Sequence, residues 1–312
     1  MWKGEGELSV LKNISLFFVV IILTACTQHR LLNSAIPTTI PAEHQVAHPI
    51  RIAVVLGGGG VRGFAHLGVL KAFEENHIPI DLLVGTSAGS IVGSLYADDP
   101  NSSKLITQLL LAKKSDLMDL RLFGKTGGLD DGYTMQKYLL DHLHAKDFKD
   151  LKIKFIAVAT DLNTGRPVAI SSGPIPPAVN ASSALPPVFR PVDLYGYTLA
   201  DGGASDVVPV NIAKRYHPQL IIAINVVQNP GDTIKKHSMF EVEKRYGLLR
   251  MKNFADYQAQ LADVVINPEV GMSGTFDFSK RPELVKAGEE ATLRAIPQIK
   301  ALMKKMNIAP TR

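Results

Sequence analysis

The chain has 312 residues, of which 46% are hydrophobic and 20% are charged. This length suffices for one large domain or two modest ones, and the composition excludes a disordered or collagen-like chain. The 34 basic side chains outnumber the 29 acidic ones, but a net charge of +5 is too small to indicate a nucleic-acid-binding protein. A small positive charge of this size is more compatible with binding to an anionic membrane surface than to a nucleic acid. The single cysteine, Cys26, excludes an internal disulfide and a cysteine-rich zinc site.

An apolar run of twelve residues, ISLFFVVIILTA at 14–25, lies near the N-terminus. It follows Lys3 and Lys12 and is shorter than the roughly 20 residues of a membrane-spanning helix, which predicts a secretory signal peptide over residues 1–25. The run ends in Leu23-Thr24-Ala25-Cys26, which resembles the bacterial lipobox. This resemblance implies cleavage before Cys26 and lipidation of its thiol. An ordinary signal peptide followed by a chance cysteine is the alternative.

The residues after Cys26 predict a tether. Residues 27–49 contain three prolines and no sustained hydrophobic periodicity, so we assign residues 26–50 to a flexible linker. A protein lipidated at Cys26 is expected in the bacterial cell envelope, where its lipid anchors it to a membrane. Thr27 stands where an aspartate would retain a lipoprotein in the inner membrane, which favours the outer membrane.

From residue 51 onward, short apolar runs alternate with segments of helical periodicity, which predicts an α/β domain with a mostly parallel sheet. Strands are expected at 51–56, 81–84, 154–160, 198–200, 220–226 and 262–266. Helices are expected at 63–76, 88–97, 102–113, 134–143, 210–216 and 282–295, with a short basic helix after Pro297. We place the main domain at 51–214 and assign 215–312 to an extension packed on the same domain.

The sequence Gly85-Thr86-Ser87-Ala88-Gly89 is a G-x-S-x-G motif between a predicted strand and a predicted helix. A serine at so sharp a turn adopts a strained backbone conformation, and the residues two before and two after it crowd each other unless they are glycines. The turn exposes the Ser87 hydroxyl at the positive end of a helix, where developing negative charge is stabilised. A Gly-Ser loop that only caps the helix is the alternative.

A second glycine-rich loop, LGGGGVRG at 56–63, also follows a strand and opens a helix. A dinucleotide fingerprint would need an acidic residue at the end of the next strand, but that strand ends in Gly85. A phosphate-binding loop would need Gly-Lys-Ser/Thr where Arg62-Gly63-Phe64 stand. The loop instead predicts an oxyanion hole formed by the main-chain N–H groups of Gly58, Gly59 and Gly60.

A third motif, Asp201-Gly202-Gly203, follows the short strand predicted at 198–200. Alone it is typical of a turn. In order with the glycine loop and the G-x-S-x-G motif, it resembles the patatin-like phospholipase family, as do Ala159-Thr160-Asp161-Leu162 and the block at 181–186. The resemblance implies a three-layer α/β/α fold related to the α/β-hydrolases, and hydrolysis of lipid acyl esters by a Ser-Asp dyad.

The resemblance also implies roles for individual residues. Ser87 corresponds to the nucleophile, Asp201 to the general base, and the amides of Gly58, Gly59 and Gly60 to the oxyanion hole. The supporting motif positions are Arg62, Gly63, Gly85, Gly89, Gly202 and Gly203. Gly203 stands where many relatives have alanine. Asp161 belongs to a family-like block, but its neighbours predict a strand end and a turn, so we expect a structural role.

The expected substrate is a membrane lipid or another fatty-acyl ester, and we expect no cofactor, metal, nucleotide or nucleic acid. His217 and His237 lack a catalytic context, and His66 is expected to be structural. We expect residues 117–133 to cover the site. A non-catalytic lipid-binding or regulatory protein of the same fold is the alternative to an enzyme.

Overall fold

The computed structural model describes residues 38–42, 49–118, 130–227, 229–231, 238–271 and 274–311. The chain divides into two units, 1–38 and 39–312, and the description below concerns the second. The predicted signal peptide and Cys26 lie outside the described residues. In the part of the chain that the structure describes, no helix is long and apolar enough to cross a bilayer.

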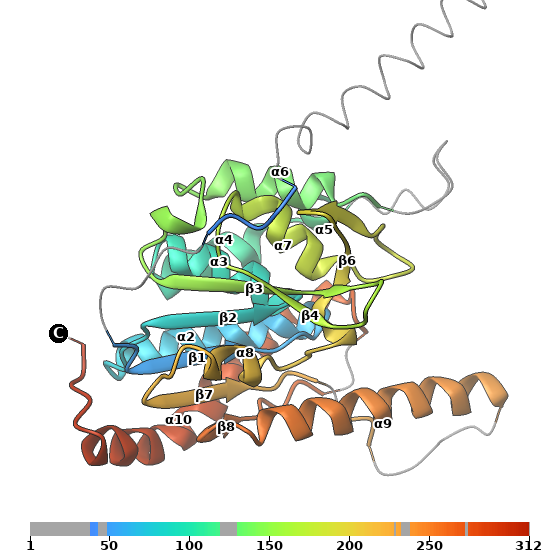
Figure 1. Ribbon diagram of the computed structural model, residues 1–312. Coiled ribbons are helices and arrows are strands. Elements are labelled where there is room, and N and C mark those ends of the chain that lie inside the picture. Colours follow the sequence, from blue (N-terminus) through green and yellow to red (C-terminus); the bar gives the residue numbers. More distant parts are fainter. Residues whose placement is uncertain are drawn as a thin grey trace, which may run out of the picture. The chain divides into compact units, whose positions relative to one another are not determined.

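One eight-stranded sheet forms the centre of the body, in the order β5-β6-β3-β2-β1-β7-β8, with β4 paired to β3 (Figure 1). The parallel strands are β1 (Ile52–Leu56), β2 (Leu82–Thr86), β3 (Lys154–Asp161), β7 (Leu220–Ile224) and β8 (Val264–Ile266). The antiparallel ones are β4 (Pro167–Ile170), β5 (Val192–Leu194) and β6 (Tyr197–Asp201). The central strands are continuous apolar runs because helices cover both faces.

Helices form a layer on each face of the sheet. On one face lie α8 (Val210–Lys214) and the C-terminal end of α9 (Met239–Ala259), which share an apolar core with β1, β2, β3 and β7. The other helices are α2 (Ala65–Glu75), α3 (Ala88–Asp98), α4 (Ser102–Leu111), α5 (Lys114–Leu117), α6 (Tyr133–His142), α7 (Ile175–Ser183) and α10 (Arg281–Lys305). The predicted three-layer α/β/α architecture with a mostly parallel sheet is therefore confirmed.

The prediction that Pro297 separates two C-terminal helices is wrong. α10 continues from Arg281 to Lys305 with Pro297 inside it. A proline removes one backbone hydrogen bond from a helix, but Ile296, Ile299 and Met303 are buried on the same helix, and this packing keeps the helix continuous.

A short part of the predicted tether touches the body. The hydroxyl of Ser172 donates to the carbonyl oxygen of Pro41 at 2.5 Å. Residues 43–48, which follow, lie outside the described part. The start of the packed body is therefore near residue 39, upstream of the expected boundary at 51.

Candidate active site

Ser87 occupies the turn between β2 and α3. Its backbone has φ 54° and ψ −122°, a conformation that a residue with a side chain rarely adopts. A Cβ on Gly85 would lie 2.5 Å from the carbonyl oxygen of Gly89, whereas a Cβ on Gly89 would collide with the carbonyl group of Leu56 in β1. The strained backbone of Ser87 is as predicted, but contact between the two glycines constrains only Gly85.

Three serines from two helices, α3 and α7, hold this elbow in place. The Ser87 N–H donates to Ser182 Oγ at 3.1 Å, and Ser182 Oγ donates to the Val158 carbonyl of β3 at 2.6 Å. The Ser87 carbonyl accepts from Ser90 Oγ at 2.7 Å and from Ser183 Oγ at 3.2 Å. Both peptide groups of Ser87 are thereby fixed, which orients its side chain independently of any ligand.

Asp201 ends β6 and is buried beside the elbow. Its Oδ1 accepts from the Gly203 N–H at 2.8 Å, and its carbonyl accepts from Thr160 Oγ1 at 2.9 Å. Burial raises the pKa of Asp201 to about 6, and hydrogen bonding to Ser87 and Gly203 opposes this rise. Its Oδ2 is buried without a hydrogen bond of ordinary geometry to any described residue. Ser87 therefore lies close enough to affect the carboxylate, and one carboxylate oxygen is available.

The glycine loop after β1 contributes fewer free donors than the sequence predicts. The Gly58 N–H donates to the Val207 carbonyl at 2.9 Å, so the assignment of Gly58 to an oxyanion hole is wrong in this conformation. The main-chain N–H groups of Gly59 and Gly60 have no acceptor among the described residues. Gly60 has φ +59°, and a Cβ there would collide with the backbone of Thr275. Two of the three predicted donors remain available.

Arg62 and Gly63 join the glycine loop to the elbow. A Cβ on Gly63 would lie 2.5 Å from Ala88 Cβ, so the loop rests directly on the residue after Ser87. The Arg62 side chain is buried in the loop, and burial lowers its pKa. Both observations agree with the supporting roles expected for these positions.

His66 is fully buried on α2, and its Nε2 lies 2.8 Å from the carbonyl oxygen of Gly57. Burial lowers the pKa of His66 to about 4, so the ring is neutral near pH 7 and Nε2–H is the donor. The contact orders the start of the glycine loop. His217 lies in a left-handed turn after α8, and His237 lies outside the described residues.

The Asp201 motif and the neighbouring Asp161 differ in their surroundings. Gly202 packs against the Val158 carbonyl, where a Cβ would not fit. Asp161 accepts from Thr164 Oγ1 at 2.7 Å and from the Asn163 N–H at 3.1 Å, and these bonds, the Thr164 one first, lower its pKa. Asp161 therefore closes a turn, as expected.

Among the described residues, no group of acidic, histidine or cysteine side chains could hold a metal.

An apolar pocket opens at Ser87. Ser87 and Ala88 line it together with Gly60 of the glycine loop. Its apolar walls include Ile91, Leu109, Met118, Met135, Phe189 and Phe278. Leu117 and Met118 are the described beginning of the segment expected to cover the site, and residues 119–129 of that segment lie outside the described part. The pocket suits an alkyl chain whose polar end reaches Ser87.

The model of the patatin-like phospholipase family matches residues 54–214, which is just over half of the chain. The chain belongs to the patatin-like phospholipase family. The mouse (Mus musculus) patatin-like phospholipase domain-containing protein 6 is 34% identical over 280 residues, which cover 76% of this chain and 20% of that protein. Lysophospholipase NTE1 of Scheffersomyces stipitis is 27% identical over 268 residues, which cover 76% of this chain and 17% of that protein.

The chain thus spans about one fifth of the length of these curated relatives. Among solved structures, VipD from Legionella pneumophila is 15% identical, with a TM-score of 0.48, and the match covers 84% of this chain and 70% of that one.

In this patatin-like chain, sequence reasoning missed Ser182 and Ser183, which contact Ser87 from α7. The block at 181–186 stands out in the sequence only by its family likeness. Nothing in it signals a contact with Ser87, because the two segments are more than ninety residues apart in the chain.

Proposed function

We propose that the chain is a lipid acyl hydrolase in which Ser87 is the nucleophile and Asp201 the general base. The observation that carries this proposal is the placement of a strained serine next to a buried carboxylate at an apolar pocket, where Asp201 Oδ2 makes no hydrogen bond of ordinary geometry to any described residue. The names of the curated relatives, phospholipase and lysophospholipase, support an acyl ester of a phospholipid as the substrate class.

In the first step, Ser87 Oγ bonds to the ester carbonyl carbon while its proton passes to the Asp201 carboxylate. The carbonyl oxygen becomes an oxyanion, which the N–H groups of Gly59 and Gly60 stabilise together with the N-terminus of α3. The carbon–oxygen bond to the leaving alcohol then breaks, and that alcohol takes the proton from Asp201. Water repeats the sequence on the acyl-enzyme and releases the fatty acid.

The environment of Asp201 favours this role. A carboxylate with an ordinary pKa near 3.8 is a weak acceptor for a hydroxyl proton, whereas burial raises the pKa of Asp201 to about 6. Its affinity for a proton is therefore closer to that of an imidazole, and no histidine is needed between serine and carboxylate.

The proposal is tested by hydrolysis of a lysophospholipid and a phospholipid by the wild-type chain, Ser87→Ala and Asp201→Asn. Both variants should bind lipid and lose most turnover. Thermal unfolding shows whether each variant is folded. Hydrolysis near the wild-type rate by a folded Ser87→Ala would refute the nucleophile, and binding without hydrolysis by the wild type would favour the non-catalytic alternative.

We further propose that Cys26 is lipidated and anchors the protein to the outer membrane of a bacterial envelope. The support is the lipobox-like sequence ending at the chain's only cysteine, with Thr27 after it. Mass analysis of the N-terminal peptide should find a diacylglyceryl group on Cys26. Two results together would contradict the anchor: a Cys26→Ser chain that still fractionates with membranes, and a wild-type chain whose N-terminal peptide lacks the added mass.

A further inference from the structure

The helix α9 extends far beyond the strands that it connects. Its 21 residues span about 31 Å, whereas β7 and β8 have five and three residues and span about 10–17 Å. The first buried residue of α9 is Ala255. Residues 239–254, here called the α9 arm, therefore contain no buried side chain, and Figure 1 shows α9 projecting from the body.

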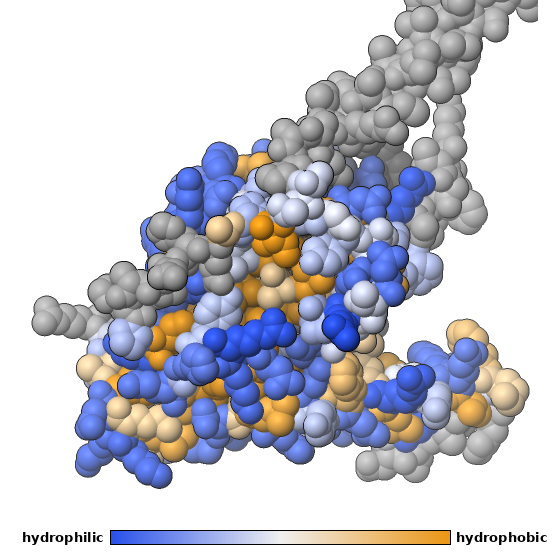
Figure 2. All heavy atoms as spheres, in the orientation of Figure 1, coloured by the Kyte–Doolittle hydropathy of each residue, from blue (hydrophilic) through white to orange (hydrophobic). Residues whose placement is uncertain are grey.

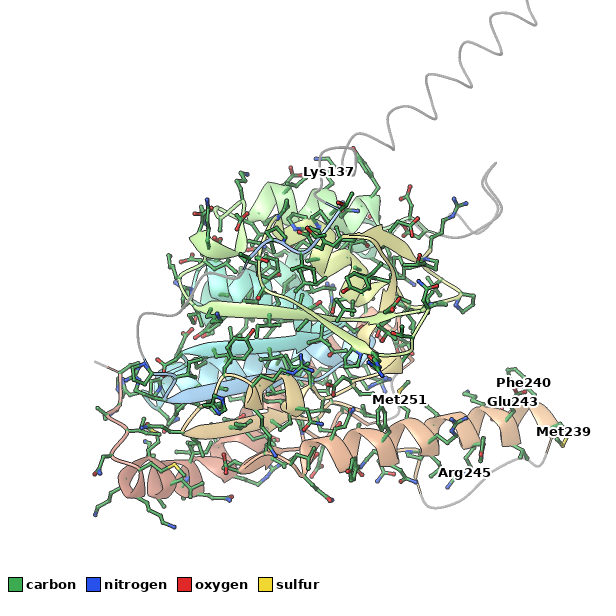
Figure 3. The ribbon with its side chains drawn as sticks, in the orientation of Figure 1. Lys137, Met239, Phe240, Glu243, Arg245 and Met251 are labelled. Atoms are coloured by element: carbon green, nitrogen blue, oxygen red, sulfur yellow. The ribbon has the colours of Figure 1, made fainter. Side chains whose placement is uncertain are left out.

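Exposed apolar side chains are concentrated on this helix. Of the fourteen large hydrophobic side chains exposed on the described part of the chain, eight belong to α9. They are Met239, Phe240, Val242, Tyr246, Leu249, Met251, Phe254 and Tyr257. At its outer end, Met239 is 79% exposed and Phe240 is 73% exposed. Figure 2 shows apolar residues among charged ones along the helix, and Figure 3 places Met239 and Phe240 at its tip. So large an exposed apolar surface indicates an interaction site.

The arm extends past the edge of the sheet that carries the proposed active site. β7 and β8 are parallel, so the helix between them runs back against both strands and begins at their carboxyl ends. β1 and β2 are parallel to β7, and their carboxyl ends lead into the glycine loop and Ser87. The outer end of α9 and the active-site pocket therefore belong to the same edge of the sheet.

The distribution of these side chains favours a lipid bilayer over a second protein helix. Successive residues of a helix are 100° apart, so the eight exposed apolar side chains spread over about 200° of the helix circumference, with Phe240 and Val242 about 160° apart. A partner helix covers one stripe, whereas a bilayer interface can take up side chains around a helix tip. The basic side chains Lys244, Arg245, Arg250 and Lys252 outnumber Glu241 and Glu243 in the arm, so attraction to anionic headgroups would add to the apolar contact.

We infer that the α9 arm docks on the surface of a lipid bilayer, with Met239 and Phe240 entering the interface, and holds the active-site edge against the membrane. Tyr246 lies two turns further along, with the Arg250 guanidinium 5.7 Å from its ring, and a tyrosine and an arginine at that distance suit the headgroup region. The inference deepens the proposed function and rests on it, because a lipid hydrolase takes its substrate from such a surface.

The test places a tryptophan at the tip of the arm. Phe240→Trp is introduced into the full chain with Trp2→Phe, which removes the chain's only native tryptophan. The protein is mixed with phosphatidylcholine vesicles that carry bromine on part of their acyl chains. The expected result is a blue shift of the tryptophan emission and quenching by the brominated lipid. The matched control is Leu293→Trp on α10, where Leu293 is 47% exposed, and it should show neither change.

Equal quenching at the two positions, or no quenching at position 240, would overturn the inference. A blue shift at position 240 that grows with protein concentration and is not quenched would assign the arm to contact with a second copy. The measurement needs no turnover and is repeated with Ser87→Ala. Quenching together with a wild type that hydrolyses no ester would mean that the proposed function fails while the docking stands.

Discussion

The hydroxyl of Thr86 donates to the carbonyl oxygen of Asp206 at 2.8 Å, which links the residue before Ser87 to the loop that carries Asp201. Thr86 is fully buried, and its methyl group packs near Gly58 and Gly202. One threonine thus contacts the elbow, the glycine loop and the aspartate motif together. We therefore expect the distance between Ser87 and Asp201 to depend on this contact.

Thr86→Val keeps the methyl contacts and removes the hydrogen bond. We expect a loss of about 1–3 kcal/mol in the free energy of unfolding, because the Asp206 carbonyl loses its donor. We also expect kcat to fall about tenfold or more, because the proposed nucleophile and base are no longer held at the distance that proton transfer requires. Denaturant unfolding and ester hydrolysis measure the two effects. Thr86→Ser should retain most of both, and a Thr86→Val enzyme with unchanged kcat would show that this link does not position the site.

Ser182→Ala removes the acceptor of the Ser87 N–H and the donor to Val158. We expect kcat to fall about tenfold with little change in KM, because the strained elbow relaxes before substrate binds. Ser183→Ala is the matched control. Its kcat should fall less than that of Ser182→Ala, because Ser90 Oγ also donates to the Ser87 carbonyl. Equal losses in the two variants would refute a specific role for Ser182.

Gly59→Ala tests the oxyanion hole that we propose for the Gly59 and Gly60 N–H groups. The added Cβ would lie 2.7 Å from Val226 Cγ2, so the loop must shift and carry the Gly59 and Gly60 N–H groups with it. Loss of one oxyanion donor in another hydrolase lowers kcat by about 10²–10³, and we expect an effect of that order here, with KM less affected. Steady-state kinetics on a soluble ester would decide. An unaltered kcat in the folded variant would place the oxyanion elsewhere.

The raised pKa of Asp201 predicts the pH dependence of activity. Asp201 accepts a proton only when it is ionised, so kcat/KM should fall as the pH drops through about 6. The folded state has a higher pKa for Asp201 than the unfolded state, so ionisation of Asp201 disfavours folding. This destabilisation grows from about pH 4 and is complete above about pH 6. Asp201→Asn should therefore be more stable than wild type at pH 8, by up to about 3 kcal/mol. A pH profile that is flat from 5 to 8 would contradict the assignment of the base.

We expect the substitution of aspartate by asparagine to change the stability of the protein in opposite directions at positions 206 and 161. Burial raises the pKa of Asp206 to about 7, against the opposing charge of Arg215, and its Oδ1 has no partner among the described residues. Asp206→Asn should therefore stabilise the protein above pH 7. The lowered pKa of Asp161 means that its ionised form adds stability above its unfolded pKa, so Asp161→Asn should destabilise it while largely retaining turnover. If thermal unfolding at pH 8 shows that both variants are stabilised, or that both are destabilised, relative to the wild type, this account is contradicted.

The sequence allowed most of the central sheet to be predicted because strands such as β1, β3 and β7 are continuous apolar runs. α7 escaped prediction because it opens with Pro176 and Pro177, which are typical of a loop as well as of a first helical turn. α9 escaped because its apolar side chains form a broad, exposed face that also carries charged residues such as Glu243 and Arg250, and this mixture obscures the pattern by which a packed helix is found.

The candidate site could be predicted as motifs but not as geometry. Ser87, Asp201 and the glycine loop are recognisable because each follows a strand and carries glycines at characteristic positions. The bond from Gly58 to Val207 could not be foreseen, since it joins segments about 150 residues apart. The same is true of Thr86 and Asp206. Local patterns identify reacting groups, whereas tertiary contacts decide which donors and acceptors remain available.

The most direct test of the proposed mechanism is reaction of the folded, full-length protein with a fluorophosphonate, followed by mass mapping of the modified peptide. These reagents phosphonylate a serine that is activated for attack on an ester-like centre. The account predicts a single phosphonyl group on Ser87, loss of ester hydrolysis in proportion to labelling, and much slower labelling of Asp201→Asn. Stable activity without labelling, or labelling of a different serine with loss of activity, would contradict it.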